Sequence, residues 1–319
     1  MVMIGYHASH EQFAPSELLR LCRKAQEAGF DCLKSSDHFH PWSERQGQSG
    51  FAWAWAGAVL EATPPLSLGM ISAPGYRYHP AVLAQAAATL AEMYEGRLWL
   101  ALGSGEALNE AITGLPWPDK AERNARLAEC AEVMRALFRG EEVTHRGRVT
   151  VIGARLYSRP AVPLPLYAAA ISPETAAEVA GWADGLLTVG GDVEKVARVV
   201  TAFRENGGAG KPVHIQHALS WADTYETALA EAADQWAPVM IGGAVNQMLS
   251  RPQDFDLAAN QLRDEDLCRD LAISADLDQH AAWIADLLGL EATLHLHCVG
   301  RNQEAFIEAF GARVLPQLR

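Results

Sequence analysis

The sequence predicts an α/β fold, a single (β/α)8 TIM barrel with insertions, and three observations lead to this expectation. Short apolar runs alternate with helical segments along the whole chain. Eight of these runs have the composition of buried strands, and they lie near residues 3, 32, 68, 99, 166, 187, 215 and 295. No linker divides the 319 residues into halves, and barrels of this type reach about 250 residues or more as one unit.

The first half of the chain contains four predicted strands, each followed by a helix. A strand over Val2–Tyr6 precedes a helix over 15–28, whose apolar residues recur at helical spacing and which Gly29 ends. The apolar run Phe30–Leu33 is the second strand, so the first 33 residues form a βαβ unit. The other strands of this half are expected at 66–72 and 97–102, and the other helices at 51–61, 80–94 and 121–138.

Two insertions interrupt the alternation in the second half. Two β-rich pieces around Arg146-Gly147 predict an exposed hairpin at about 141–157. A second insertion is expected at about 241–277, where an interval rich in Gly, Asn and Asp occurs. The remaining elements are strands at 164–170, 185–189, 212–219 and 293–298, and helices at 173–182, 192–205, 223–236, 278–288 and 302–313. All of them are assigned to one domain, residues 1–319.

A doubly wound sheet is the alternative fold. It requires a Gly-x-Gly-x-x-Gly turn after the first strand. That turn is absent: the segment Gly103-Ser104-Gly105-Glu106 follows the fourth strand and lacks the third glycine. The barrel is therefore the better prediction.

The composition excludes several classes of partner. Lys and Arg total 26 against 39 Asp and Glu, so the formal net charge is −13, whereas nucleic acids and anionic membranes are bound by basic surfaces. The five cysteines form no Cys-x-x-Cys pair, so neither disulfides nor a structural zinc are expected. The sequence shows no charged leader and no apolar run of about 18 residues. We therefore expect a cytoplasmic protein with no nucleic-acid partner and no membrane contact.

Chemically active side chains follow the predicted strands. The segment Ser35–Trp42 follows the second strand and contains Asp37, His38 and Trp42. Strand ends of a barrel converge on the ligand site, so these residues should meet Glu106, which follows the fourth strand. Histidine transfers protons near neutral pH, which makes His38 and Glu106 a candidate acid and base pair. Neighbours on an extended segment point to opposite sides, so one of Asp37 and His38 is expected to face the site while the other braces the loop.

Two further histidines share one face of the last predicted strand. His295 and His297 could together bind a metal, but no carboxylate or third ligand accompanies them. We expect no metal site here, and we assign both residues to the barrel interior.

Four motifs occur in order in the first third of the chain: Ala8–Pro15 (ASHEQFAP), Ser36–Trp42 (SDHFHPW), Arg77–Val82 (RYHPAV) and Gly103–Glu110 (GSGEALNE). Together they resemble the luciferase-like (LLM class) flavin and deazaflavin oxidoreductases. Within that family they are most similar to the branch of glucose-6-phosphate dehydrogenases that use the deazaflavin coenzyme F420. The resemblance implies a (β/α)8 barrel with a flavin-like ring lying across the strand ends.

The resemblance also implies a role for each matching residue. His38 would be the base at the substrate hydroxyl, Glu106 the proton donor to the cofactor, and Trp42 the residue that stabilises the intermediate. A bulge with a non-prolyl cis peptide at Met70-Ile71 would press against the ring. Cofactor contacts are expected at Asp37, Met70, Ile71, Glu106, Asn109, Ile171 and Ser172, and substrate-pocket contacts at Glu11, His38 and Trp42.

Two departures from this branch affect the expected substrate and cofactor. The branch binds its substrate's phosphate with three cations, and the matching positions here hold Asp192, Asn246 and Asp270. Acids at these places would repel a phosphate, so glucose 6-phosphate is not the expected substrate. Ile171-Ser172 replaces a glycine pair near the cofactor phosphate, which resembles a side group thought to use FMN.

The leading hypothesis is therefore a flavin-dependent oxidoreductase, an FMN-dependent monooxygenase or dehydrogenase, acting on a small organic molecule. A separate flavin reductase would be the partner of the monooxygenase form. The alternative is an F420-dependent dehydrogenase or reductase that transfers a hydride between an alcohol-type substrate and the deazaflavin. A catalytically silent flavin-binding protein and a metal-dependent hydrolase are further alternatives. A homodimer is expected from the family, with Trp53 and Trp55 as candidate interface residues.

Overall fold

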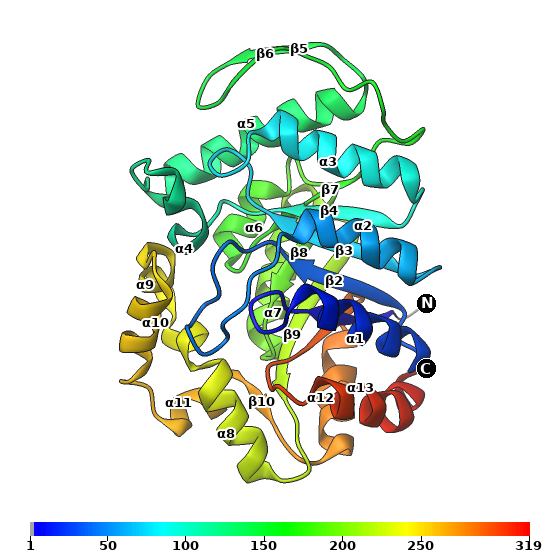
Figure 1. Ribbon diagram of the computed structural model, residues 1–319, viewed down its shortest axis with the longest axis vertical. Coiled ribbons are helices and arrows are strands. Elements are labelled where there is room, and N and C mark those ends of the chain that lie inside the picture. Colours follow the sequence, from blue (N-terminus) through cyan, green and yellow to red (C-terminus); the bar gives the residue numbers. More distant parts are fainter. Residues whose placement is uncertain (1–2) are drawn as a thin grey trace.

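The computed structural model describes residues 3–319 and shows a closed barrel of eight parallel strands surrounded by helices (Figure 1). The strands follow the order β1-β2-β3-β4-β7-β8-β9-β11, and β11 pairs with β1 to close the barrel. The predicted (β/α)8 fold is confirmed; Val2 lies outside the described residues. The barrel strands are β1 (Ile4–Ala8), β2 (Cys32–Ser36), β3 (Ser67–Ser72), β4 (Leu98–Leu102), β7 (Leu166–Ala169), β8 (Gly185–Val189), β9 (Val213–Ser220) and β11 (Thr293–Cys298).

The surrounding helices begin and end close to the positions that the sequence predicts. They are α1 (Pro15–Glu27), α2 (Ala52–Ala62), α3 (Pro80–Met93), α5 (Lys120–Phe138), α6 (Pro173–Val179), α7 (Val193–Phe203), α8 (Tyr225–Gln235), α12 (Leu277–Leu288) and α13 (Gln303–Ala309). In α1, for example, Pro15 lies in the first turn and Gly29 follows the helix with a φ of 93°, a left-handed value that glycine adopts readily. Across residues 3–319, no helix combines the length and apolarity that crossing a membrane requires.

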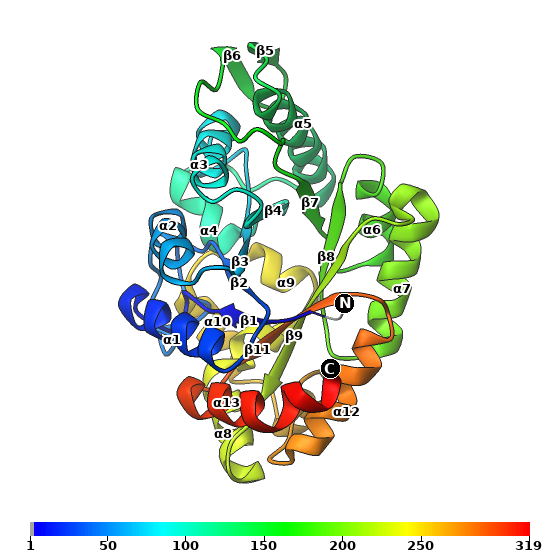
Figure 2. The same cartoon turned by 90° about the vertical axis from the view of Figure 1, so that its right-hand side faces the viewer.

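Two regions depart from the barrel repeat. β5 (Val143–Arg146) and β6 (Thr150–Ala154) form an antiparallel hairpin, which lies beyond α5 at one end of the molecule (Figure 2). The second region contains α9 (Gly243–Met248), α10 (Pro252–Ala259), α11 (Asp264–Asp270) and the two-residue strand β10 (Ala272–Ile273), which pairs with β9. Short helical segments are α4 (Ala107–Glu110), η1 (Ala111–Thr113), η2 (Arg204–Gly208), η3 (Ala237–Ile241), η4 (Phe310–Val314) and η5 (Leu315–Leu318).

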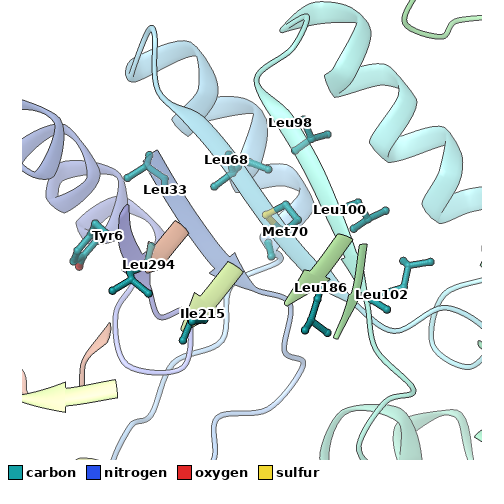
Figure 3. Close-up of a cluster of buried hydrophobic side chains, with 14 of the residues drawn as sticks. Tyr6, Leu33, Leu68, Met70, Leu98, Leu100, Leu102, Leu186, Ile215 and Leu294 are labelled. Carbon is teal, nitrogen blue, oxygen red and sulfur yellow. The ribbon is translucent and has the colours of Figure 1, made fainter. Parts of the chain in front are cut away.

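Side chains that point outward from the strands form the main hydrophobic core between the barrel and its helices. Tyr6, Leu33, Leu68 and Leu98 make one row across β1 to β4, because the strand register pairs each residue with the next. Figure 3 shows this row with the outward side chains of neighbouring strands. Full burial stabilises a side chain of this size by about 1.5–3 kcal/mol, so this layer fixes which face of each strand points into the barrel.

Trp53 and Trp55 of α2 belong to this core, so the expectation that they form a subunit interface is wrong. They are only 6% and 5% exposed. The Trp53 indole donates to Asp37 Oδ2 at 3.1 Å, and the Trp55 indole donates to the backbone oxygen of Pro15 at 3.1 Å. Helix α2 therefore directs both indoles inward, and the homodimer itself stays a prediction.

The interior of the barrel is rich in polar side chains. Lys34 of β2 is fully buried, and its Nζ donates to Gln216 Oε1 at 2.5 Å. Gln216 Nε2 in turn lies 3.1 Å from His297 Nδ1, and His295 Nε2 lies 2.9 Å from His214 Nδ1. Burial lowers the pKa of all three of these histidines, so they are neutral near pH 7. His295 and His297 are thus hydrogen-bonded inside the barrel, and no metal-binding group of three or more His, Cys, Asp or Glu side chains occurs in the described chain.

Candidate active site

A cavity of about 230 Å³ opens at the carboxyl ends of β2, β3, β4, β7 and β8. Parallel strands of a barrel end on the same side, which is why residues far apart in the sequence meet here. The apolar part of the lining consists of Ile71, Ala73, Ala169, Ala170, Ile171 and Val189. Its polar groups include Asp37, His38, Ser72, Glu106 and Asn109. Six of the site residues predicted from the sequence therefore line one cavity, namely Asp37, His38, Ile71, Glu106, Asn109 and Ile171.

His38 enters this cavity from the segment after β2, and its side chain is 10% exposed. Its Nδ1 lies 3.3 Å from the backbone oxygen of His40, which can only accept, so Nδ1 carries the hydrogen of the neutral ring. The free lone pair is then on Nε2, which lies 3.4 Å from Glu11 Oε1 and 3.9 Å from Glu106 Oε2. Neutral His38 is therefore arranged to accept a proton at Nε2, and the imidazolium that forms would pair with Glu11.

Glu11 is the carboxylate that orients His38. It is buried and accepts hydrogen bonds from Ser9 Oγ at 2.9 Å and Ser36 Oγ at 2.7 Å. Burial alone raises the pKa of Glu11, but the positive charge of protonated His38 and the hydrogen bonds from the serines outweigh burial and lower the pKa to about 2. Glu11 is thus ionised at neutral pH. The two serines were not predicted as site residues, although both lie within motifs that the sequence shows.

Glu106 is the second carboxyl beside His38, and its environment differs. Its side chain is 36% exposed in the cavity. Burial raises the pKa of Glu106; His38 opposes this effect and the Glu11 carboxylate adds to it. Glu106 therefore keeps a proton to higher pH than Glu11 does. Two carboxyls with opposite pKa shifts beside one imidazole are an arrangement typical of acid and base catalysis.

Asp37 points away from His38 and braces the loop, as the alternation of the extended segment predicts. Its carboxylate accepts hydrogen bonds from Trp53 Nε1, Ser72 Oγ, Tyr78 OH and Arg77 Nη1 at 3.1, 2.7, 3.1 and 3.3 Å. Arg77 also donates from Nη2 to the Asp37 backbone oxygen at 2.8 Å. Sequence reasoning missed this role of Arg77 and Tyr78, and their place in the motif Arg77–Val82 was the available signal.

Asn109 and Trp42 hold the same loop from two sides. Asn109 Oδ1 accepts the backbone N–H groups of Phe39 at 2.8 Å and His40 at 3.3 Å, which ties the loop to α4. The Trp42 ring lies 5.2 Å from the His38 ring and 5.3 Å from the Phe255 ring of α10, measured between centroids. Both residues therefore help to fix the position of His38, and Asn109 also lines the cavity, whereas Trp42 does not.

The structure corrects the prediction for Met70. Met70 and Ile71 lie in regular β3 pairing, and the cis peptide bond of the described chain is Pro64-Pro65, so the expected cis bond at Met70-Ile71 is absent there. Successive side chains of a strand point to opposite faces: Ile71 lines the cavity, whereas Met70 packs in the outer core. Met70 is therefore not placed to touch a cofactor.

Ile171 and Ser172 lie at the other end of the cavity. Ile171 is 67% exposed and forms part of the lining. Ser172 caps α6, since its Oγ accepts the Thr175 N–H at 3.3 Å, and Thr175 rather than Ser172 lines the cavity. The residue that lines the cavity here is thus three positions further along the chain than the sequence suggested, and the hydroxyl of Ser172 already caps α6.

The lining of the cavity suits a flat ring cofactor. Gly103-Ser104-Gly105 and three alanines add little bulk to the lining, and polar groups gather near His38. A barrel with such a cavity, a histidine base and two differently tuned carboxyls has the features of an oxidoreductase that uses a bound ring cofactor.

Comparison with known proteins identifies the family. The luciferase-like monooxygenase family model matches residues 2–293, and the chain belongs to this family. It is 36% identical to the F420-dependent glucose-6-phosphate dehydrogenase of Mycolicibacterium gilvum, over 99% of this chain and 98% of that protein. It is 34% identical to the enzyme of the same name from Amycolatopsis mediterranei, over 100% and 99%.

Among solved structures, an F420-dependent secondary alcohol dehydrogenase in complex with an F420-acetone adduct is similar, with a TM-score of 0.92 and 29% identity over 100% of this chain and 99% of that one. The protein is accordingly a flavin- or deazaflavin-dependent oxidoreductase.

Proposed function

We propose that this protein is an F420-dependent dehydrogenase that transfers a hydride between an alcohol-type substrate and the deazaflavin. The observation that carries the proposal is the free Nε2 of His38, which faces the cavity between the Glu11 and Glu106 carboxyls. F420, when bound, supplies a ring that accepts or donates a hydride. His38 would take the hydroxyl proton of the alcohol, and Glu11 would stabilise the imidazolium that forms. Glu106 would hold a proton for donation to the cofactor.

The relatives support F420 rather than FMN as the cofactor. The two relatives and the solved structure reported above are all named as F420-dependent. FMN, the cofactor of the leading sequence-based hypothesis, is named in a more distant structure, a riboflavin lyase with modified FMN that is 15% identical with a TM-score of 0.75, which is a likeness of fold alone. The replacement of a glycine pair by Ile171-Ser172 therefore does not by itself indicate FMN. An F420 enzyme would also need no separate flavin reductase.

Cofactor titration tests the proposal. The purified protein is titrated with F420 and, separately, with FMN, and binding is followed by the quenching of each ring's fluorescence. We expect saturable binding of F420 and much weaker binding of FMN, followed by loss of F420 absorbance when an alcohol is added. Tight binding of FMN without binding of F420 would contradict the proposal and favour FMN as the cofactor. Binding of F420 with no turnover of any alcohol or sugar phosphate would support the silent flavin-binding alternative.

A further inference from the structure

A second cavity of about 280 Å³ adjoins the candidate active site. It lies between the loop after β8, the end of β9 and the segment η3, and it shares Ile171 and Val189 with the first cavity. Both shared residues are partly exposed, at 67% and 42%. The two cavities therefore meet at these two side chains.

The second cavity is mainly apolar. Its walls consist of aliphatic side chains, one methionine and one indole, namely Val189, Val196, Ala218, Trp236, Val239 and Met240. Asn246, one of the three positions that could have carried a cation, donates from Nδ2 to the Val239 backbone oxygen at 2.7 Å, so it supports the wall. Such a lining favours an uncharged, apolar group over a hydrated ionic one.

The charged residues at the rim do not suit an anion. Lys195 is the one cation among the described lining residues, and its Nζ lies 2.7 Å from Asp270 and 3.8 Å from Asp192. Two carboxylates against one ammonium leave this rim with a net charge of −1. A phosphate placed here would approach both acids and would have to displace Asp270 from Lys195.

We propose that the substrate is an uncharged secondary alcohol whose apolar substituent occupies the second cavity, not a phosphorylated sugar. This inference rests on the proposed function. In the reaction, the C–H bond of the carbinol carbon breaks and its electron pair leaves with the hydrogen to reduce F420. The O–H bond gives its proton to His38, and the alcohol becomes a ketone. The reaction therefore needs no oxidant other than F420.

A series of alcohols tests the inference. kcat/KM is measured with F420 for 2-propanol, 2-butanol, 2-hexanol and glucose 6-phosphate. Each methylene buried in the second cavity is expected to raise kcat/KM about fourfold, which corresponds to about 0.8 kcal/mol of transfer free energy. A kcat/KM that does not change from 2-propanol to 2-hexanol would overturn the proposal, and so would a larger value for glucose 6-phosphate than for every alcohol.

Two methionines provide a matched pair of variants. Met240→Lys puts an ammonium in the wall of the second cavity, whereas Met248→Lys changes an exposed methionine of α9 that lines neither cavity. We expect Met240→Lys to lower kcat/KM for 2-hexanol at least tenfold with little effect on 2-propanol, and Met248→Lys to change neither. Ala218→Phe, which fills the same cavity, is the second variant should Met240→Lys fold poorly. Equal loss on both alcohols would contradict the assignment of the cavity.

Fluorescence titration with F420 distinguishes a failure of the substrate inference from a failure of the proposed function. If F420 binds and the alcohols are not oxidised, or are oxidised without a chain-length dependence, the substrate inference fails and the cofactor assignment stands. If F420 does not bind, the proposed function itself fails.

Discussion

Two adjacent residues of one loop, Asp37 and His38, have different roles: Asp37 anchors the loop and His38 faces the cavity. The side chain of His38 lies in the cavity with its Nε2 facing two carboxyls, and the side chain of Asp37 is turned to Trp53, Ser72, and the motif that begins at Arg77. Because the segment is extended, one residue can react only if its neighbour anchors the backbone on the other side. Substitutions of the two residues should therefore have different consequences.

Replacing Asp37 by Asn should mainly reduce stability. The side chains of Asp37 and Arg77 are 0% and 9% exposed, and removing one partner of a buried ion pair costs about 3–5 kcal/mol. Urea denaturation of Asp37→Asn should show a loss of this size in the free energy of unfolding. Glu141→Gln, which breaks an exposed pair with Arg139, is the control and should not differ measurably from wild type. A stable Asp37→Asn protein with weakened F420 binding would instead assign Asp37 to the cofactor.

Replacing His38 by Ala should mainly reduce turnover. A lost general base slows reactions by about 10²-fold or more, whereas the remaining lining of the cavity is unchanged, so the dissociation constant of F420 should stay nearly the same. His40→Ala is the matched control, since the His40 ring bonds to the Leu108 backbone oxygen and does not line the cavity. Steady-state kinetics and F420 titration measure both variants. Turnover of His38→Ala equal to that of wild type would remove His38 from the mechanism.

At the scale of elements, the sequence predicts where strands and helices lie better than it predicts which way they face. Alternation of apolar runs and helical segments placed all eight barrel strands. Which face of β3 points into the barrel was not predictable from Leu68, Met70 and Ile71, because apolar residues occupy both faces of this strand. The short strand β10 was missed since its two residues carry no periodicity. Apart from Ser9, the side-chain hydrogen-bond partners of Glu11 and Asp37 lie 16 to 41 positions away in the sequence, so no local pattern showed them.

Helix α10, in the second insertion, contacts the segment that carries His38 through one pair of aromatic rings, Phe255 and Trp42. Phe255 is fully buried, and its ring meets that of Trp42 nearly edge-on at 82°. Phe255→Ala should cost about 3–5 kcal/mol of stability and should also lower turnover about tenfold, because Trp42 loses the neighbour that positions it. Phe203→Ala, a fully buried phenylalanine of α7, should cost similar stability. Equal turnover of the two variants, measured well below their unfolding temperatures, would show that α10 has no part in positioning Trp42.

At the scale of the whole molecule, the barrel encloses a polar interior in an apolar shell. Closure of the barrel could be predicted by counting strands, but the partners of Lys34 could not, because they come from β1 and β9. Burial lowers the pKa of Lys34 to about 7, although Glu11 pulls it upward, and the ordinary value is 10.5. The neutral histidines around Lys34 provide no negative charge, and no carboxylate lies within 4 Å of it in the described chain. Folding therefore disfavours the protonated form of this lysine.

The pH dependence of stability tests this arrangement. Between about pH 7 and pH 10 the unfolded chain binds the Lys34 proton and the folded chain does not, so this residue makes the free energy of unfolding rise with pH, by roughly 1.4 kcal/mol per pH unit. Below pH 7 both states are protonated and the slope from Lys34 vanishes. Lys34→Met should remove this slope in urea denaturation at pH 7, 8 and 9, whatever its absolute stability after losing the hydrogen bonds to His7 and Gln216. Lys24→Met at the surface should keep the wild-type slope, because the ion pair with Glu304 raises the pKa of Lys24 and moves its titration above this range. Identical slopes for Lys34→Met and wild type would show that Lys34 stays charged inside the barrel.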